Sequence, residues 1–164
     1  DAAGAGGSRL LLRVNTERAR LSIARALASM LRDVGLEVVV RPSETATQIA
    51  DLNAGRFDLA LMQVPEVLEP HVLSWFFDSS RIPEDGAIGA NRWRLRDDVV
   101  DAALERGRAA ADRAERQAAY RIVQERLHET LPVFPLWQES KVAVVRRGVP
   151  FDVPRDGRLS TLAR

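Results

Sequence analysis

Apolar and polar residues alternate along the first part of the chain with two different periods. Short apolar runs of strand length cover residues 9–14, 36–40 and 57–64. Between them, over 18–34 and 45–54, apolar residues recur at spacings of three and four, the pattern of a helix with one buried face. This alternation of strand and helix predicts an α/β fold with a parallel-rich sheet and right-handed crossovers.

Residues that favour turns mark the ends of these predicted elements. Gly35 and Gly55 follow the two helical patterns, at the place where a left-handed glycine commonly ends a helix. Pro42 and Pro65 should end the second and third strands, because proline cannot donate a hydrogen bond to a neighbouring strand. Thr45, three residues before a glutamine, is the expected cap of the second helix.

The second half of the chain is predicted to be irregular at first and then helical. Turn-forming residues are frequent over 78–96, and a loop of that length in a compact domain is usually functional or mobile. Helices should begin at Asp97 and at Asp112, where an acidic residue precedes apolar residues at helical spacing. Residues 134–137 and 141–145 are expected to be extended.

The composition is that of a globular protein without disulfides. Of the 164 residues, 46% are hydrophobic and 29% are charged, the formal net charge is +1, and cysteine is absent. The near-neutral charge gives no overall basic field that would attract nucleic acid or a membrane surface. No apolar run approaches the ~20 residues of a membrane span, and without cysteine both disulfides and thiol chemistry are excluded.

No motif typical of a catalytic or metal site is present in the sequence. The two histidines, His71 and His128, are far apart, and neither a metal-ligand spacing nor a phosphate-binding glycine loop occurs. His71 lies three residues before Ser74, but the sequence around this serine is not that of a nucleophile. We therefore expect a protein that is not an enzyme and has no metal and no cofactor.

An arginine-rich stretch has two interpretations. Arg92, Arg94 and Arg96 alternate with Trp93 and Leu95, which could provide stacking and phosphate contacts for a single-stranded nucleic acid. The neutral net charge favours the other interpretation, a solvated loop that is anchored by its tryptophan. No nucleic acid partner is expected.

The segment 55–77 is the candidate for the functional part of the chain. A buried strand should end there at a proline, and Glu66 and Glu69 follow just beyond its carboxyl end, where ligands bind in open α/β sheets. Glu66 is either one more exposed acid of a turn or a carboxylate that binds the ammonium group of a ligand. The residues alone leave both interpretations open.

Five short blocks occur in a fixed order between Leu10 and about Phe151. They are Leu31-Arg32-Asp33-Val34-Gly35-Leu36-Glu37-Val38; Gly55-Arg56-Phe57-Asp58-Leu59; Glu69-Pro70 with Leu73, Phe76 or Phe77, and Ser79; Asn91 with Asp97 and Asp101; and Arg116 with Tyr120 and Pro132-Val133-Phe134-Pro135-Leu136. In this order and spacing they resemble the C-terminal part of the extracytoplasmic solute-binding proteins of ABC importers, in the peptide- and nickel-binding group (solute-binding protein family 5).

This resemblance implies one lobe of a two-lobed periplasmic-binding-protein fold of type II, a parallel-rich mixed sheet flanked by helices, with the ligand held between the lobes. In peptide-binding relatives, an acid three residues before the D/E-P dipeptide holds the α-ammonium group of the peptide, and Glu66 has that place. Met62 and Gln63 stand where those relatives usually carry Gly-Trp, a departure that leaves the kind of solute open. With Val64 and Asn91 these residues form the expected ligand-binding set.

The resemblance also implies how the chain is divided and which partners it has. Residues 1–8 are expected to be a flexible start, 9–138 the solute-binding lobe, and 139–164 a crossover and tail that would pack on a missing N-terminal lobe. The partners would be that lobe, a small solute such as an oligopeptide, and an ABC permease. The location would be periplasmic or extracellular, with membrane contact only through a lipid anchor or the permease.

Two other functions remain open for the same lobe. In this family's fold it also serves as the solute-sensing domain of transcription regulators, and it occurs in envelope lipoproteins that no longer serve transport. An upstream helix-turn-helix would favour the regulator. A signal peptide with a lipid-modified cysteine would favour the transporter or the lipoprotein.

Overall fold

The computed structural model describes residues 9–64, 69–84, 88–138 and 144–148. Its elements, in chain order, are β1 (Arg9–Asn15), α1 (Arg18–Asp33), β2 (Glu37–Ser43), α2 (Thr45–Asn53), β3 (Leu59–Ala60), the 3-10 turn η1 (Pro70–Val72), α3 (Leu73–Phe77), the 3-10 turn η2 (Ser79–Arg81), α4 (Asp98–Ala109) and α5 (Arg113–Thr130). None of the helices in these ranges is long and apolar enough to cross a membrane.

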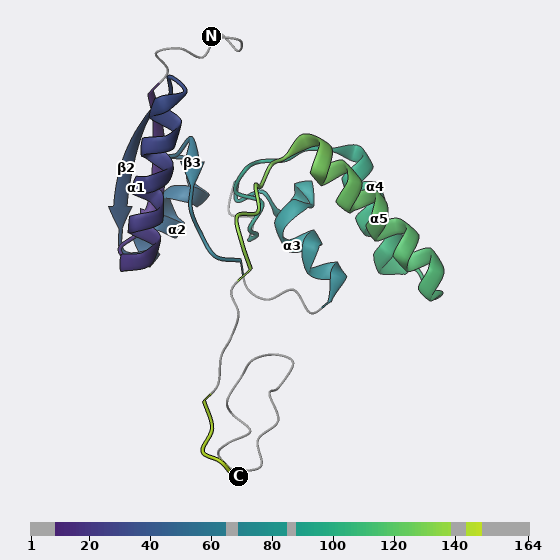
Figure 1. Ribbon diagram of the computed structural model, residues 1–164. Helices are drawn as coiled ribbons and strands as arrows, with labels where there is room; N and C mark the ends of the chain where they lie inside the picture. Colours follow the sequence, from purple (N-terminus) through teal and green to yellow (C-terminus); the bar gives the residue numbers. More distant parts are fainter. Residues whose placement is uncertain (1–8, 65–68, 85–87, 139–143, 149–164) are drawn as a thin grey trace.

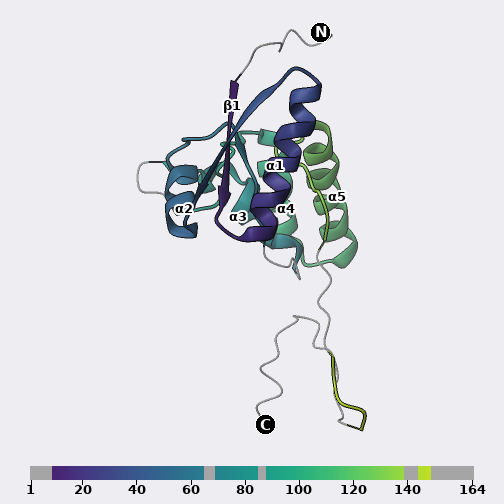
Figure 2. The ribbon, with the colours of Figure 1, turned by 60° about the vertical axis from the view of Figure 1, so that its left-hand side comes forward.

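The three strands form one parallel sheet in the order β2-β1-β3. Asn15 lies opposite Ser43 at the end of the β1–β2 pair, while β3 pairs with Leu12 and Arg13. The chain passes from β1 to β2 and then back across β1 to β3, so right-handed crossovers place α1 and α2 on opposite faces. Figure 2 shows these helices on opposite sides of β1. The parallel α/β fold expected from the sequence is confirmed.

Two of the expected element ends are wrong. The strand β2 continues past Pro42, which is tolerated because β2 is an edge strand. The cap of α2 is Glu44 and not Thr45, and no side chain bonds to its first N–H groups. Gln48, expected to complete a capping box, instead donates from Nε2 to the carbonyl of Leu61 at 3.1 Å.

The strand β3 is shorter than the run 57–64 from which it was predicted. Strand geometry is limited to Leu59–Ala60, although the N–H groups of Asp58 and Leu61 still donate to carbonyls of β1, at 3.1 and 2.9 Å. The Asp58 carboxylate also accepts from the N–H of Leu11 at 2.7 Å. The aspartate of the G-x-F-D block thus joins β3 to β1 through both its backbone and its side chain.

The helices α4 and α5 begin where acidic residues predicted them. Asp97 caps α4 by accepting from the N–H groups of Val99 and Val100, at 3.0 and 3.2 Å. Asp112 caps α5 in the same way. Residues 134–137, expected to be extended, form no strand of the sheet, and 141–143 lie outside the described residues.

Two hydrophobic clusters form the interior. The first lies between the sheet and α1 and contains Leu12, Val14, Ala24, Ala28, Val38 and Leu61. The second lies between α4 and α5 and contains Val100, Ala103, Leu104, Tyr120 and Val123. Figure 1 shows the corresponding halves of the molecule: the sheet half with α1 and α2, and the helical half with α3, α4 and α5.

Candidate functional site: the carboxyl edge of the sheet

The loops that follow the three strands meet at the carboxyl edge of the sheet. The strands β1 and β2 end there at Asn15 and Ser43, which lie opposite each other. Continuing the β1–β3 register places Met62 level with Asn15 and Gln63 level with Thr16. The edge therefore presents residues from three loops in one row.

The crevice of this edge lies between β1 and β3. After β1 the chain turns into α1, whereas after β3 it passes to the helical half (Figure 1). Neighbouring strands whose connections leave in different directions create a topological switch point, which is the usual ligand position in open α/β sheets. Thr16 and Gln63 flank this point.

Hydrogen bonds between side chains connect the loops of the edge. Thr16 Oγ1 donates to Glu44 Oε1 at 3.3 Å, which links the loops after β1 and β2. The guanidinium of Arg20, in the first turn of α1, donates to Gln63 Oε1, which links the β1 side of the crevice to the β3 side.

The first turn of α1 is capped from within. The Glu17 carboxylate accepts from the N–H groups of Ala19 and Arg20, at 2.9 and 3.0 Å. These two bonds lower the pKa of Glu17, against the opposing effect of burial. The N–H groups at the start of α1 are therefore engaged by Glu17.

Three of the residues expected to bind ligand lie at this edge. Met62 is half-buried, whereas Gln63 and Val64 are exposed. Glu66 lies outside the described residues, so its assignment stays a prediction.

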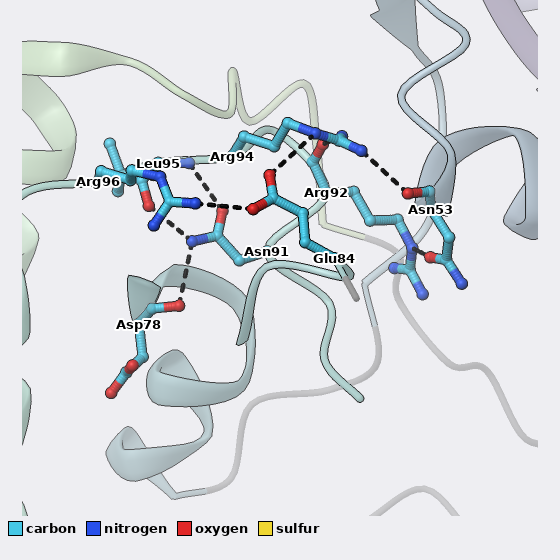
Figure 3. Close-up of polar contacts among 8 residues, drawn as sticks. All are labelled: Asn53, Asp78, Glu84, Asn91, Arg92, Arg94, Leu95 and Arg96. Carbon is cyan, nitrogen blue, oxygen red and sulfur yellow. Dashed lines mark hydrogen bonds and ion pairs between the residues drawn. The ribbon is translucent and has the colours of Figure 1, made fainter. Parts of the chain in front are cut away.

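Asn91, the fifth residue of the expected set, is fully buried in the loop 78–96. Its Nδ2 donates to the carbonyls of Asp78 and Leu95, at 3.1 and 2.8 Å, and its Oδ1 accepts from the N–H of Leu95 at 2.9 Å. Figure 3 shows the amide between these two segments. Both amide hydrogens are used to hold the loop in shape, so we leave Asn91 out of the site proposed below.

Solved structures resemble this fold over most of the chain. The Escherichia coli murein tripeptide binding protein MppA is 28% identical over 80% of this chain and 25% of its own, with a TM-score of 0.67. NikA from Brucella suis, in complex with Fe(III)-EDTA, is 25% identical over 74% of this chain and 24% of its own, with a TM-score of 0.59. The periplasmic binding protein DppA from Helicobacter pylori, in complex with the peptide STSA, has the same fold at 19% identity, with a TM-score of 0.68 over 80% of this chain and 25% of its own.

This chain belongs to the solute-binding proteins of the peptide- and nickel-binding group. The resemblance carried by the five sequence blocks is thus confirmed, together with the type II periplasmic-binding-protein fold. The chain spans about a quarter of the length of these solved proteins, between 24% and 25%. No family model matches the sequence, and no curated protein matches it.

In this solute-binding fold, the loop 78–96 ties the helical half to the sheet half. Arg92 Nε donates to Asn53 Oδ1 at 2.8 Å, and Arg94 donates to the carbonyl of Asn53 at 3.0 Å (Figure 3). Asn53 is the last residue of α2, where a cation is favourable. Trp93 packs on Phe77 with ring centres 5.2 Å apart. The loop is therefore anchored, and burial lowers the pKa of Arg92.

Residues from two separate blocks of the family pattern meet on the helical half. Arg116 pairs with the carboxylate of Glu69, donates to the carbonyl of Gly107 at 3.1 Å, and lies 5.3 Å from the ring centre of Tyr120. The other oxygen of Glu69 accepts from the N–H of His71 at 2.8 Å and so caps η1. These contacts fix the point at which the chain enters the helical half after β3.

Neither a metal centre nor an enclosed pocket is found at the edge in the described ranges. No group of three or more His, Asp or Glu side chains is close enough to hold a metal ion in the described part of the chain. A shallow hollow of about 440 Å³ lies between α4 and α5, away from the strand ends, and its lining is mainly alanine. An open edge is what one wall of an inter-lobe site would present.

Proposed function

We propose that this chain is the ligand-binding lobe of a substrate-binding protein that delivers a peptide or another small solute to an ABC importer. The observation that carries the proposal is the carboxyl edge, where Met62, Gln63 and Val64 leave β3 beside the crevice of a parallel sheet. Two solved proteins at 25% identity or more support it, MppA as a murein tripeptide binding protein and NikA in complex with Fe(III)-EDTA. The protein binds and does not catalyse.

The second wall of the site would come from another lobe of the full-length protein. Solute sites bury most of their ligand, and a single open edge buries too little of it. We assign residues 9–138 to the lobe, 1–8 to a flexible start and 139–164 to a crossover and tail that would contact the other lobe. The place of action is the outer side of the membrane, with an ABC permease as partner.

Within this site we assign Glu66 to the ammonium group of the solute. Glu66 follows β3 by a few residues and precedes Glu69, whose position is fixed by Arg116, so it belongs to the segment that leaves the carboxyl edge. A carboxylate there can accept a charge-assisted hydrogen bond from a ligand ammonium. Met62, Gln63 and Val64 would line the same wall.

The experiment is calorimetry on the full-length protein with Glu66→Gln and, as a control, Glu125→Gln on the exposed side of α5. Against a peptide with a free amino terminus, Glu66→Gln should cost about 1.5–3 kcal/mol of binding free energy, the scale of a hydrogen bond to a charged group. The control should change nothing. Equal affinities in all three proteins would make Glu66 a turn residue. Failure of the wild type to bind any solute of a peptide and chelate panel would refute the function.

A further inference from the structure

A basic side chain also reaches into the crevice between β1 and β3. Arg20 belongs to α1, which follows β1, and its guanidinium contacts Gln63, which follows β3. The hydrogen bond therefore crosses between the two loops that flank the topological switch point. A positive charge thus stands where a ligand of an open α/β sheet is expected.

Arg20 has no acidic partner within the described ranges. Its guanidinium bonds to the neutral amide of Gln63, and no carboxylate of a described residue forms an ion pair with it. By contrast, Arg13 and Arg116, which are also partly buried, each pair with a carboxylate. A guanidinium has five N–H donors, so most of those of Arg20 remain for another group.

The acids near Arg20 are engaged elsewhere. Glu17, which interacts electrostatically with Arg20, accepts two backbone N–H groups of α1. Glu44 accepts from Thr16 on the β2 side of the edge. The start of α1 is therefore capped by Glu17, and the open donors in the crevice are those of the Arg20 side chain.

Gln63 gives Arg20 its orientation. The amide oxygen of Gln63 accepts one N–H of the guanidinium, whereas a tryptophan, which has only a donor, could not accept this bond. A guanidinium held at one edge is preorganised to present its other donors to a planar oxyanion, which it can bind through two parallel bonds.

We propose that Arg20, oriented by Gln63, binds a carboxylate group of the solute. The inference rests on the proposed function and narrows it, because it assigns the ligand to small solutes with a free carboxylate, such as a peptide with an unblocked carboxyl terminus. Arg20 is then a residue that determines specificity. A neutral analogue of the same shape binds more weakly.

The test uses the full-length protein, isothermal calorimetry and two probes, trialanine and its carboxyl-terminal amide. Wild type should bind the acid at least about tenfold more tightly than the amide. Arg20→Gln should lower the affinity for the acid to that for the amide and leave the amide unchanged. Arg20→Lys should retain part of the preference, since lysine keeps the charge without the planar fork. Arg25→Gln, at an exposed position of the same helix, should behave like wild type.

Each alternative outcome identifies what is wrong. An acid preference that survives Arg20→Gln, or equal losses for both probes, would overturn the role of Arg20 while the proposed function stands. Equal binding of acid and amide by wild type would do the same. If wild type bound neither probe, the peptide form of the proposed function and this inference would fail together. Thermal unfolding of each variant verifies that it is folded.

Discussion

Replacing Gly55 by alanine tests the junction between the sheet half and the helical half. Gly55 follows α2 with a φ of 70°, and an added Cβ would lie 2.9 Å from the guanidinium carbon of Arg94. That guanidinium donates to the carbonyls of Asn53 and Arg92, both at 3.0 Å (Figure 3). Alanine at this position therefore meets both an unfavourable backbone conformation and a neighbour that must move.

The expected cost has two parts. A left-handed conformation costs a residue with a Cβ roughly 1–2 kcal/mol. The displaced guanidinium of Arg94 then weakens its bonds to the end of α2; because 33% of this side chain is exposed, we assign this part about 1 kcal/mol, below the range for buried charged groups. Gly55→Ala should therefore lower the free energy of unfolding by about 2–3 kcal/mol.

Gly35→Ala is the matched control, because Gly35 has a φ of 88° and no atom within 4 Å of an added Cβ. Urea unfolding should show only the backbone cost for Gly35→Ala and the larger loss for Gly55→Ala. In an Arg94→Ala background, Gly55→Ala should fall to the value of the control. Equal losses at the two glycines in the wild-type background would refute the contribution of Arg94.

Three further perturbations follow from the described contacts. Gly107→Ala should lower the melting temperature despite the higher helix propensity of alanine, because its Cβ would lie 2.9 Å from the buried ring of Tyr120. Burial raises the pKa of Asp97, but the bonds from Arg126 and from N–H groups of α4 lower it more. Its carboxylate therefore stabilises the fold at neutral pH and loses this effect as the pH falls through the lowered pKa, so Asp97→Asn should flatten the acid limb of a stability–pH curve. The 164-residue chain alone should bind trialanine more weakly than 1 μM by calorimetry, as roughly one wall of a two-walled site; submicromolar binding would contradict this.

The elements of the sheet half could be predicted because short-range patterns decide them. Gly35 and Gly55 have the positive φ expected of residues that end helices, 88° and 70°. Asp97 and Asp112 cap α4 and α5 through bonds to residues two or three positions away. Such bonds depend on neighbours in sequence, so the printed residues contain the necessary information.

The wrong expectations share a tertiary cause. The capping box at Thr45 and Gln48 is a local motif, but the glutamine side chain is buried and bonds to Leu61 of the next strand. Pro42 stays within β2 because this strand has a neighbour on one side only, a fact of sheet order that no local pattern contains.

The contacts that join the halves could not be predicted from one sequence. Arg94 reaches Asn53 across 41 positions, and Arg116 reaches Glu69 across 47. Nothing in the spacing of arginines distinguishes these two from the exposed ones. The signal that was available is that Glu69 and Arg116 both fall in blocks of the family pattern, which says that both matter without saying that they touch.

The position of the candidate site and its chemistry come from different levels of the structure. Strand order alone places a crevice between β1 and β3 at the carboxyl edge, and this could be anticipated from an apolar strand that ends before an acidic loop. The charge in that crevice depends on Arg20, whose side chain leaves one loop and bonds to Gln63 of another. Relatives with the same strand order can therefore keep the same site and differ in solute, because one residue of α1 and one residue after β3 are enough to change what the edge attracts.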